Sequence, residues 1–148
     1  LTDRVQIHKD IYLGDRGIEG DEPLYTSHPN KPFLCYDKGM VVMYQLYKLI
    51  GEKNMNTAFK KLLEKYAYPH QPPTSLNLIE ELKTVSNTVM HDKIDELFKT
   101  ITTYDLSVQS ASVMPKGNDY LLSFEIEAKK YLENIDGSRK NMAFHELV

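Results

Sequence analysis

The sequence has a single cysteine and no long apolar run. Cys35 has no partner for a disulfide within the chain, and it leaves the redox compartment open. No stretch approaches the roughly 20 apolar residues that a membrane-crossing helix needs, and the first residues lack the basic-then-apolar pattern of a secretion signal. These absences predict a chain with neither an internal disulfide nor a transmembrane segment, and they leave its cellular location unknown.

The chain also lacks a strong charge of either sign. Its formal net charge is −3, so electrostatics gives no reason to expect nucleic acid or an anionic membrane as a partner. Of its 148 residues, 41% are hydrophobic and 26% are charged, which is typical of one globular domain or slightly more with a substantial core.

No motif for metal, phosphate or nucleophilic chemistry is present. The five histidines form neither a His-x-x-x-His pair nor a His-Glu-x-x-His helix. They are His8, His28, His70, His91 and His145. Gly14, Gly17 and Gly20 follow no strand, so we interpret them as loop glycines. The sequence therefore predicts no zinc site built by this chain alone, and no catalytic set can be assembled from spacing.

The most apolar stretch, residues 40–50, predicts a central helix. Only Gln45 and Lys48 are plainly polar within it, which is typical of a helix buried on most faces. Gly51 predicts its end. One stripe at helical spacing starts from a phenol, so we expect a role for that hydroxyl. The stripe consists of Tyr36, Met40, Met43, Tyr47 and Ile50.

Before this helix, residues 3–13 predict the end of another helix stopped by Gly14. Residues 14–32 are rich in glycine, proline and polar side chains, which predicts a long irregular loop. Within that loop, Glu22-Pro23-Leu24-Tyr25 combines apolar content with a restricted backbone, so we expect it to be pinned down.

Three further helices are predicted after the central one. Residues 52–66 form an amphipathic pattern, Thr74 or Ser75 can cap the next helix, and a last one begins near Asp92. Their predicted inward residues are Met55, Phe59, Leu62 and Tyr66, then Leu76, Ile79, Leu82 and Val85, then Ile94, Leu97, Phe98 and Ile101. Four helical patterns joined by short loops predict an antiparallel array.

From Thr102 the apolar period changes to two, which predicts strands. Turns are expected at residues 115–119 and at Asp136-Gly137, with a third strand at 142–148. The fold class is thus α+β: a helical part over residues 1–102 and a small antiparallel β segment over 103–148, expected to be truncated. A three-stranded sheet with one apolar face needs another element to bury that face. Open strand edges predict self-association between molecules.

Several segments together resemble the aminopeptidase N family of zinc metallopeptidases, the gluzincins with a thermolysin-like catalytic domain. These segments are Tyr36-Asp37-Lys38-Gly39, Leu49-Ile50-Gly51-Glu52, the amphipathic helix through Phe59 and Tyr66, and Pro73-Thr74-Ser75-Leu76-Asn77-Leu78. The resemblance covers roughly residues 20–101. The later segment, from Thr103-Tyr104-Asp105 to Glu127-Ala128-Lys129-Lys130, is similar to bacterial members fused to a permease-like membrane region.

The resemblance implies that Tyr36 is the catalytic tyrosine, which donates a hydrogen bond to the oxyanion formed during peptide hydrolysis. A phenol is neutral at neutral pH, so it stabilises developing negative charge without adding charge to the ground state. Gly39 would let a neighbouring element approach closely, and no catalytic role is carried over to Lys38. The resemblance places the zinc ligands and the general base upstream, in a full-length and membrane-attached parent. The fragment itself is then expected to be inactive and to hold no zinc.

Two alternatives stay open. Tyr36 could be a half-buried tyrosine whose hydroxyl caps a backbone group. The chain could also be a non-catalytic helical module that binds a peptide or protein. His28 and His70 neighbour prolines, so we expect both to be exposed to solvent.

Overall fold

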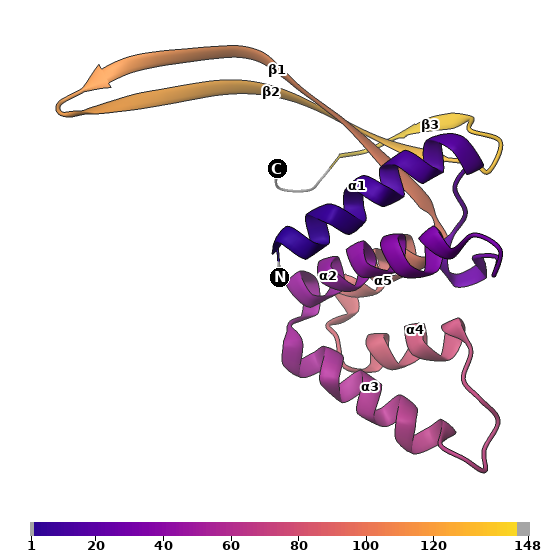
Figure 1. The fold of residues 1–148 in the computed structure, drawn as a ribbon. Coiled ribbons are helices and arrows are strands. Elements are labelled where there is room, and N and C mark those ends of the chain that lie inside the picture. The colour runs from indigo at the N-terminus through magenta and orange to yellow at the C-terminus, as the bar shows by residue number, and fades with distance from the viewer. Residues whose placement is uncertain (1, 145–148) are drawn as a thin grey trace. The chain divides into compact units, whose positions relative to one another are not determined.

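A computed structural model describes residues 2–144 of the chain (Figure 1). The chain forms two compact units, Leu1–Ile101 and Thr102–Val148, here named unit 1 and unit 2. Unit 1 is built from helices, and unit 2 is a three-stranded antiparallel sheet. The predicted α+β class, a helical array followed by a small antiparallel β segment, is therefore confirmed.

The first helix, α1, spans Thr2–Glu19 and is longer than the sequence predicts. It passes through Gly14 and Gly17 and ends at Gly20, which has a φ of 74°. Only a residue without a Cβ adopts that backbone conformation readily, so Gly20 is the true helix stop. The predicted helix end at Gly14 is wrong. The predicted loop over 14–32 shrinks accordingly and contains a short 3-10 helix, Leu24–Thr26.

A π-helical turn, Leu34–Lys38, leads into the central helix α2, Gly39–Ile50. Gly51, with a φ of 80°, ends α2 as predicted. The buried positions of α2 are Gly39, Val42, Leu46 and Ile50. The helix is therefore buried along one stripe and not on most faces. Three members of the predicted stripe, Met40, Met43 and Tyr47, line one pocket, while the first member, Tyr36, is exposed.

The next two helices agree with the prediction. Helix α3 spans Glu52–Tyr66 and α4 spans Ser75–Thr84. The Thr74 side chain accepts a hydrogen bond from the Asn77 amide, and the Asn77 side chain accepts one from the Thr74 amide. This reciprocal capping box satisfies two amide donors that a helix start otherwise leaves unpaired.

After a 3-10 helix, Thr88–Met90, α5 runs over His91–Lys99 and begins one residue before the predicted Asp92. The core of unit 1 lies among α2, α3, α4 and α5. Its fully buried large side chains include Leu46, Leu82 and Ile94. Leu76, expected to face inward, is exposed, and Ile101, expected in the last helix, opens the first strand.

Unit 2 is a long β-hairpin with a short third strand (Figure 1). Its strands are β1 (Ile101–Lys116), β2 (Asp119–Glu133) and β3 (Arg139–Met142), in the order β1-β2-β3. Gly117, with a φ of 66°, lies in the predicted first turn. The pairing of β3 with β2 runs from Lys130↔Met142 to Glu133↔Arg139.

The third strand, Arg139–Met142, begins before the predicted start at Met142, because the tight turn at Asp136-Gly137 lets pairing resume at once. Most of the predicted segment, residues 145–148, falls outside the described residues. Within residues 2–144, no helix combines the length and the apolar character that crossing a bilayer requires.

Candidate functional site

Tyr36 lies on the outer side of the π-helical turn and is 73% exposed. The same turn is anchored on its inner side, because Phe33 and Leu34 are buried in the protein. The Gly39 amide donates a hydrogen bond to the Leu34 carbonyl, which is the wide spacing of a π turn. Such turns occur frequently at functional sites because the extra residue redirects a side chain.

A buried ion pair anchors this turn on its inner side. The Lys38 ammonium donates to Asp21 Oδ1 at 2.9 Å and to the Glu22 carbonyl oxygen. Asp21 also accepts hydrogen bonds from the Tyr12 hydroxyl and from Arg16 Nε, the latter at 3.2 Å. Asp21 and Lys38 are each only 5% exposed. We name Tyr12, Arg16, Asp21 and Lys38 the Asp21 network; it joins α1, the following loop and the π turn.

Burial lowers the pKa of the Lys38 ammonium from its ordinary value of 10.5, because a charge taken out of water is destabilised. The charge of Asp21 and its hydrogen bond act in the opposite direction but do not offset the burial. Lys38, to which the sequence assigns no catalytic role, is thus paired and buried.

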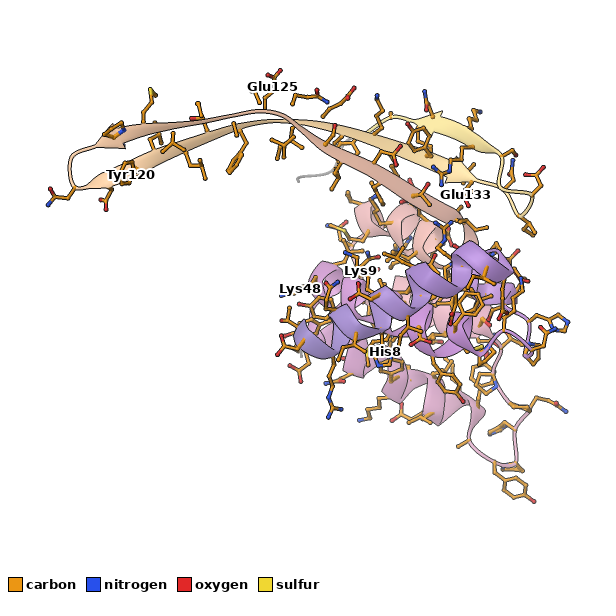
Figure 2. All side chains as sticks on the ribbon, turned by 45° about the horizontal axis from the view of Figure 1, so that its top comes forward. His8, Lys9, Lys48, Tyr120, Glu125 and Glu133 are labelled. Carbon is orange, nitrogen blue, oxygen red and sulfur yellow. The ribbon has the colours of Figure 1, made fainter. Side chains whose placement is uncertain are left out.

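A hydrogen bond and an ion pair fix the surroundings of the turn. His8 Nδ1 of α1 lies 2.7 Å from Asp37 Oδ1 of the turn, and His8 is labelled in Figure 2. Glu22 lies 2.8 Å from Lys31, whose hydrogen bond is the main reason that the pKa of Glu22 is lowered. Leu24 and its neighbour Tyr25 also pack against the core. The prediction that residues 22–25 are pinned down is therefore confirmed.

The arrangement presents one phenol to solvent from a firmly held segment of backbone. Tyr36 is mostly exposed, which differs from the alternative of a half-buried, backbone-capping tyrosine. The expectation for Gly39 is wrong: a Cβ there would meet only the Leu34 carbonyl oxygen, at an ordinary 3.8 Å, so no neighbouring element approaches closely. His28 and His70 are exposed, as predicted.

Zinc was expected to bind residues outside this chain. Over residues 2–144, His, Cys, Asp and Glu side chains form no group of three that could hold a metal ion. The donor set present therefore does not fit a structural or catalytic zinc, which needs three or four such ligands. Where zinc binds in a longer protein stays a prediction.

A second feature is an apolar pocket between α2 and α3, with a volume of about 220 Å³. It is lined by Met40, Met43, Tyr44, Tyr47, Glu52, Met55, Asn56 and Phe59. The Tyr44 and Tyr47 rings stack with centroids 6.3 Å apart, and Lys48 Nζ lies 5.4 Å and 5.9 Å from the two centroids. Lys48, labelled in Figure 2, thus helps to fix the rim of the pocket.

Sequence reasoning did not identify the Asp21 network or the pocket. The partial signal for the network was the spacing of Tyr12 and Arg16, one helical turn apart and followed by an acid. Comparison of the chain with protein-family models, with curated proteins and with solved structures finds no significant match. The resemblance to the aminopeptidase N family therefore stays a prediction.

Proposed function

We propose that the chain is the helical part of an aminopeptidase-like catalytic domain followed by the start of a β domain, and that Tyr36 stabilises the oxyanion of peptide hydrolysis. The observation that supports this proposal is the 73% exposure of Tyr36 on a π turn whose other side is anchored by buried residues. An exposed phenol on a held backbone can meet a substrate carbonyl from outside the chain.

The physical argument rests on preorganisation. A donor stabilises a transition state most when its position needs no rearrangement as charge develops. The Asp21 network and the His8–Asp37 contact hold the backbone just after Tyr36, and the buried Phe33 and Leu34 hold it just before. Loss of one such donor typically lowers kcat by about 10²- to 10³-fold.

In this proposal the other parts of the site belong to a longer parent protein. The parent would supply the zinc, its ligands, the general base and the residues that bind the substrate's free amine. This chain alone would therefore not hydrolyse peptides. The partner of the parent is a peptide substrate, and no nucleic acid is expected. In the more specific form of this proposal, the parent is attached to a membrane through a permease-like region.

The test substitutes Tyr36→Phe in the full-length parent, with Tyr68→Phe as a matched control. Tyr68 is 97% exposed and lies after α3, away from the π turn in the sequence. Tyr36→Phe should lower hydrolysis of an aminoacyl anilide about 10²- to 10³-fold, with bound zinc unchanged by elemental analysis. Equal turnover in both variants would end the assignment. Sequencing upstream should also reveal a His-Glu-x-x-His helix.

A second candidate is a non-catalytic helical module that binds a peptide or protein. The apolar pocket between α2 and α3 favours it, because a methionine-rich and aromatic lining accommodates apolar side chains of varied shape. A probe such as N-acetyl-leucine amide should then shift the NMR signals of Met40 and Met43. Met43→Lys should abolish the shift of the Met40 signal, while Tyr36→Phe should leave the shifts of both signals unchanged. Unshifted signals at millimolar probe would exclude this candidate.

Self-association along strand edges is part of the proposal for the isolated chain. Within residues 2–144, strand β1 is an edge strand of the sheet, and β2 is paired with β3 only from Lys130 to Glu133. Unpaired amides and carbonyls on such edges can pair with a second chain. Amide hydrogen exchange that is slow along β1 at high protein concentration and fast at low concentration would support this pairing.

A further inference from the structure

One face of the hairpin in unit 2 is apolar and open to solvent. Seven of its large side chains have exposed fractions between 47% and 74%. They are Leu106, Val108 and Val113 of β1 and Tyr120, Leu122, Phe124 and Ile126 of β2, and we name them the hairpin face. Side chains project from the hairpin around Tyr120 and Glu125 with no described segment of unit 2 over them (Figure 2).

The alternation of β2 and two contacts show that these residues share one face. On β2, Tyr120, Leu122, Phe124 and Ile126 alternate with Glu125 and its polar neighbours, so they lie opposite the Glu125 side. Ser110 of β1 donates a hydrogen bond to Glu125, which places Ser110 on the polar side and Val113 with the apolar set. Near the base, Lys130 Nζ lies 5.7 Å from the Tyr104 ring centroid, which places the even-numbered residues of β1 with those of β2.

Strand β1 changes phase between these two regions. Gln109 donates to Glu127, and the adjacent Ser110 donates to Glu125, so neighbouring residues of β1 contact the same side of β2. Adjacent residues of a regular strand point to opposite sides, so these contacts indicate a β-bulge at Gln109-Ser110. The bulge brings Val108 and Val113, which regular alternation would separate, onto one apolar face.

The size of the hairpin face distinguishes it from ordinary exposed residues. At about 100 Å² of exposed apolar surface for each half-exposed side chain, the seven residues present on the order of 700 Å². The largest apolar patch of a monomer is typically about 300–600 Å². A standard interface buries about 800 Å² on each partner. The hairpin face is therefore large enough for a specific interface.

We propose that the hairpin face binds the hairpin face of a second copy of this chain, sheet against sheet. No charged side chain lies on the face between Tyr120 and Ile126, so the face is complementary to an apolar surface such as itself. Two copies related by a twofold axis would bury on the order of 1,400 Å² in total, within the range of standard interfaces. The acidic Glu125 and Glu127 stay in water on the other side and disfavour an anionic membrane as the occupant.

The main test is sedimentation velocity of the full 148-residue chain at micromolar concentration, where wild type should be a dimer. Phe124→Glu should raise the dissociation constant at least about tenfold, because it places a charge in the apolar interface. Ser123→Glu adds the same charge one residue away on the polar side and should leave the dimer intact. Leu122→Ser provides a milder change if Phe124→Glu fails to fold by circular dichroism. A monomer, a polydisperse aggregate, or equal effects of Phe124→Glu and Ser123→Glu would overturn the inference.

A second measurement separates face packing from edge pairing. In a Cys35→Ser background, Ala111→Cys lies on the hairpin face and Ser112→Cys lies on the opposite side. Face packing predicts that a maleimide modifies Cys at 111 more slowly than at 112, and that dilution removes the difference. Equal rates at both positions, with slow amide exchange along β1, would support edge pairing and overturn face packing. The inference concerns unit 2 alone and does not rest on the role of Tyr36.

Discussion

Substitution of Asp21 by alanine should destabilise unit 1 by about 3–5 kcal/mol. Asp21 is 5% exposed and accepts hydrogen bonds from Lys38, Tyr12 and Arg16. Removing one partner of a buried ion pair typically costs about that much, because the other charge stays buried without compensation. Lys38→Met should cost less, since Asp21 keeps its bonds to Tyr12 and Arg16. The double variant should be more stable than the sum of the single effects predicts.

The pKa of Lys38 adds a pH dependence with a definite sign. The folded-state pKa is lowered below the ordinary 10.5, mainly by burial. Below the lowered pKa, Lys38 is charged in both states and its burial penalty is fully present. Between the lowered pKa and 10.5, the unfolded chain binds more protons, so the free energy of unfolding rises with pH. Wild type should therefore gain stability relative to Lys38→Met as the pH approaches 10.5.

Urea unfolding followed by circular dichroism at the helical signal measures both effects. Glu19→Ala is the matched control, because Glu19 is an exposed acid two residues from Asp21. Its loss at the C-terminal end of α1 should be neutral or slightly stabilising. If Asp21→Ala cost less than about 1 kcal/mol, or no more than Glu19→Ala, the buried pair could not be what holds the π turn.

Three other substitutions test local features. Gly14→Ala should stabilise the protein by about 0.5–1 kcal/mol, since Gly14 lies inside α1 with nothing within 4 Å of an added Cβ; a loss of thermal stability would contradict this. Thr74→Ala should cost about 1 kcal/mol in urea, through loss of the cap of α4. Burial raises the pKa of Asp95, but hydrogen bonds from Lys83 and Lys99 together outweigh it and hold that pKa below 3.8. The contribution of the Asp95 carboxylate to the free energy of unfolding is therefore fully present above pH 3.8 and is lost as the pH falls through the lowered pKa. The melting temperatures of Asp95→Asn and wild type should accordingly converge at the lowest pH.

Local signals were sufficient for much of unit 1. The helix end at Gly51 and the start of α4 after Thr74 follow from backbone conformation and capping, which depend on neighbouring residues only. The two long strands of unit 2 follow from alternation of apolar and polar residues, which runs over 122–128 in β2 and is interrupted in β1 by the bulge at Gln109-Ser110. Each of these features could be predicted because residues close together in the sequence decide it.

Features set by distant contacts could not be predicted. Two internal glycines argue for ending α1 early, at a cost of about 1 kcal/mol each. The structure offsets that cost because Tyr12 and Arg16, on either side of Gly14, both bind Asp21 beyond the helix. The π turn was missed for the same reason, since the burial of Lys38 against Asp21 is not visible in local sequence.

The most direct test of the role of Tyr36 is the affinity of a phosphinic peptide, which mimics the tetrahedral oxyanion, for the zinc-loaded parent. If Tyr36 stabilises the transition state, the Tyr36→Phe variant should bind this analogue about 100-fold more weakly than the wild-type parent does. The KM of the variant for an aminoacyl anilide should change little. Unchanged affinity for the analogue, with the Tyr68→Phe control behaving identically, would contradict the account.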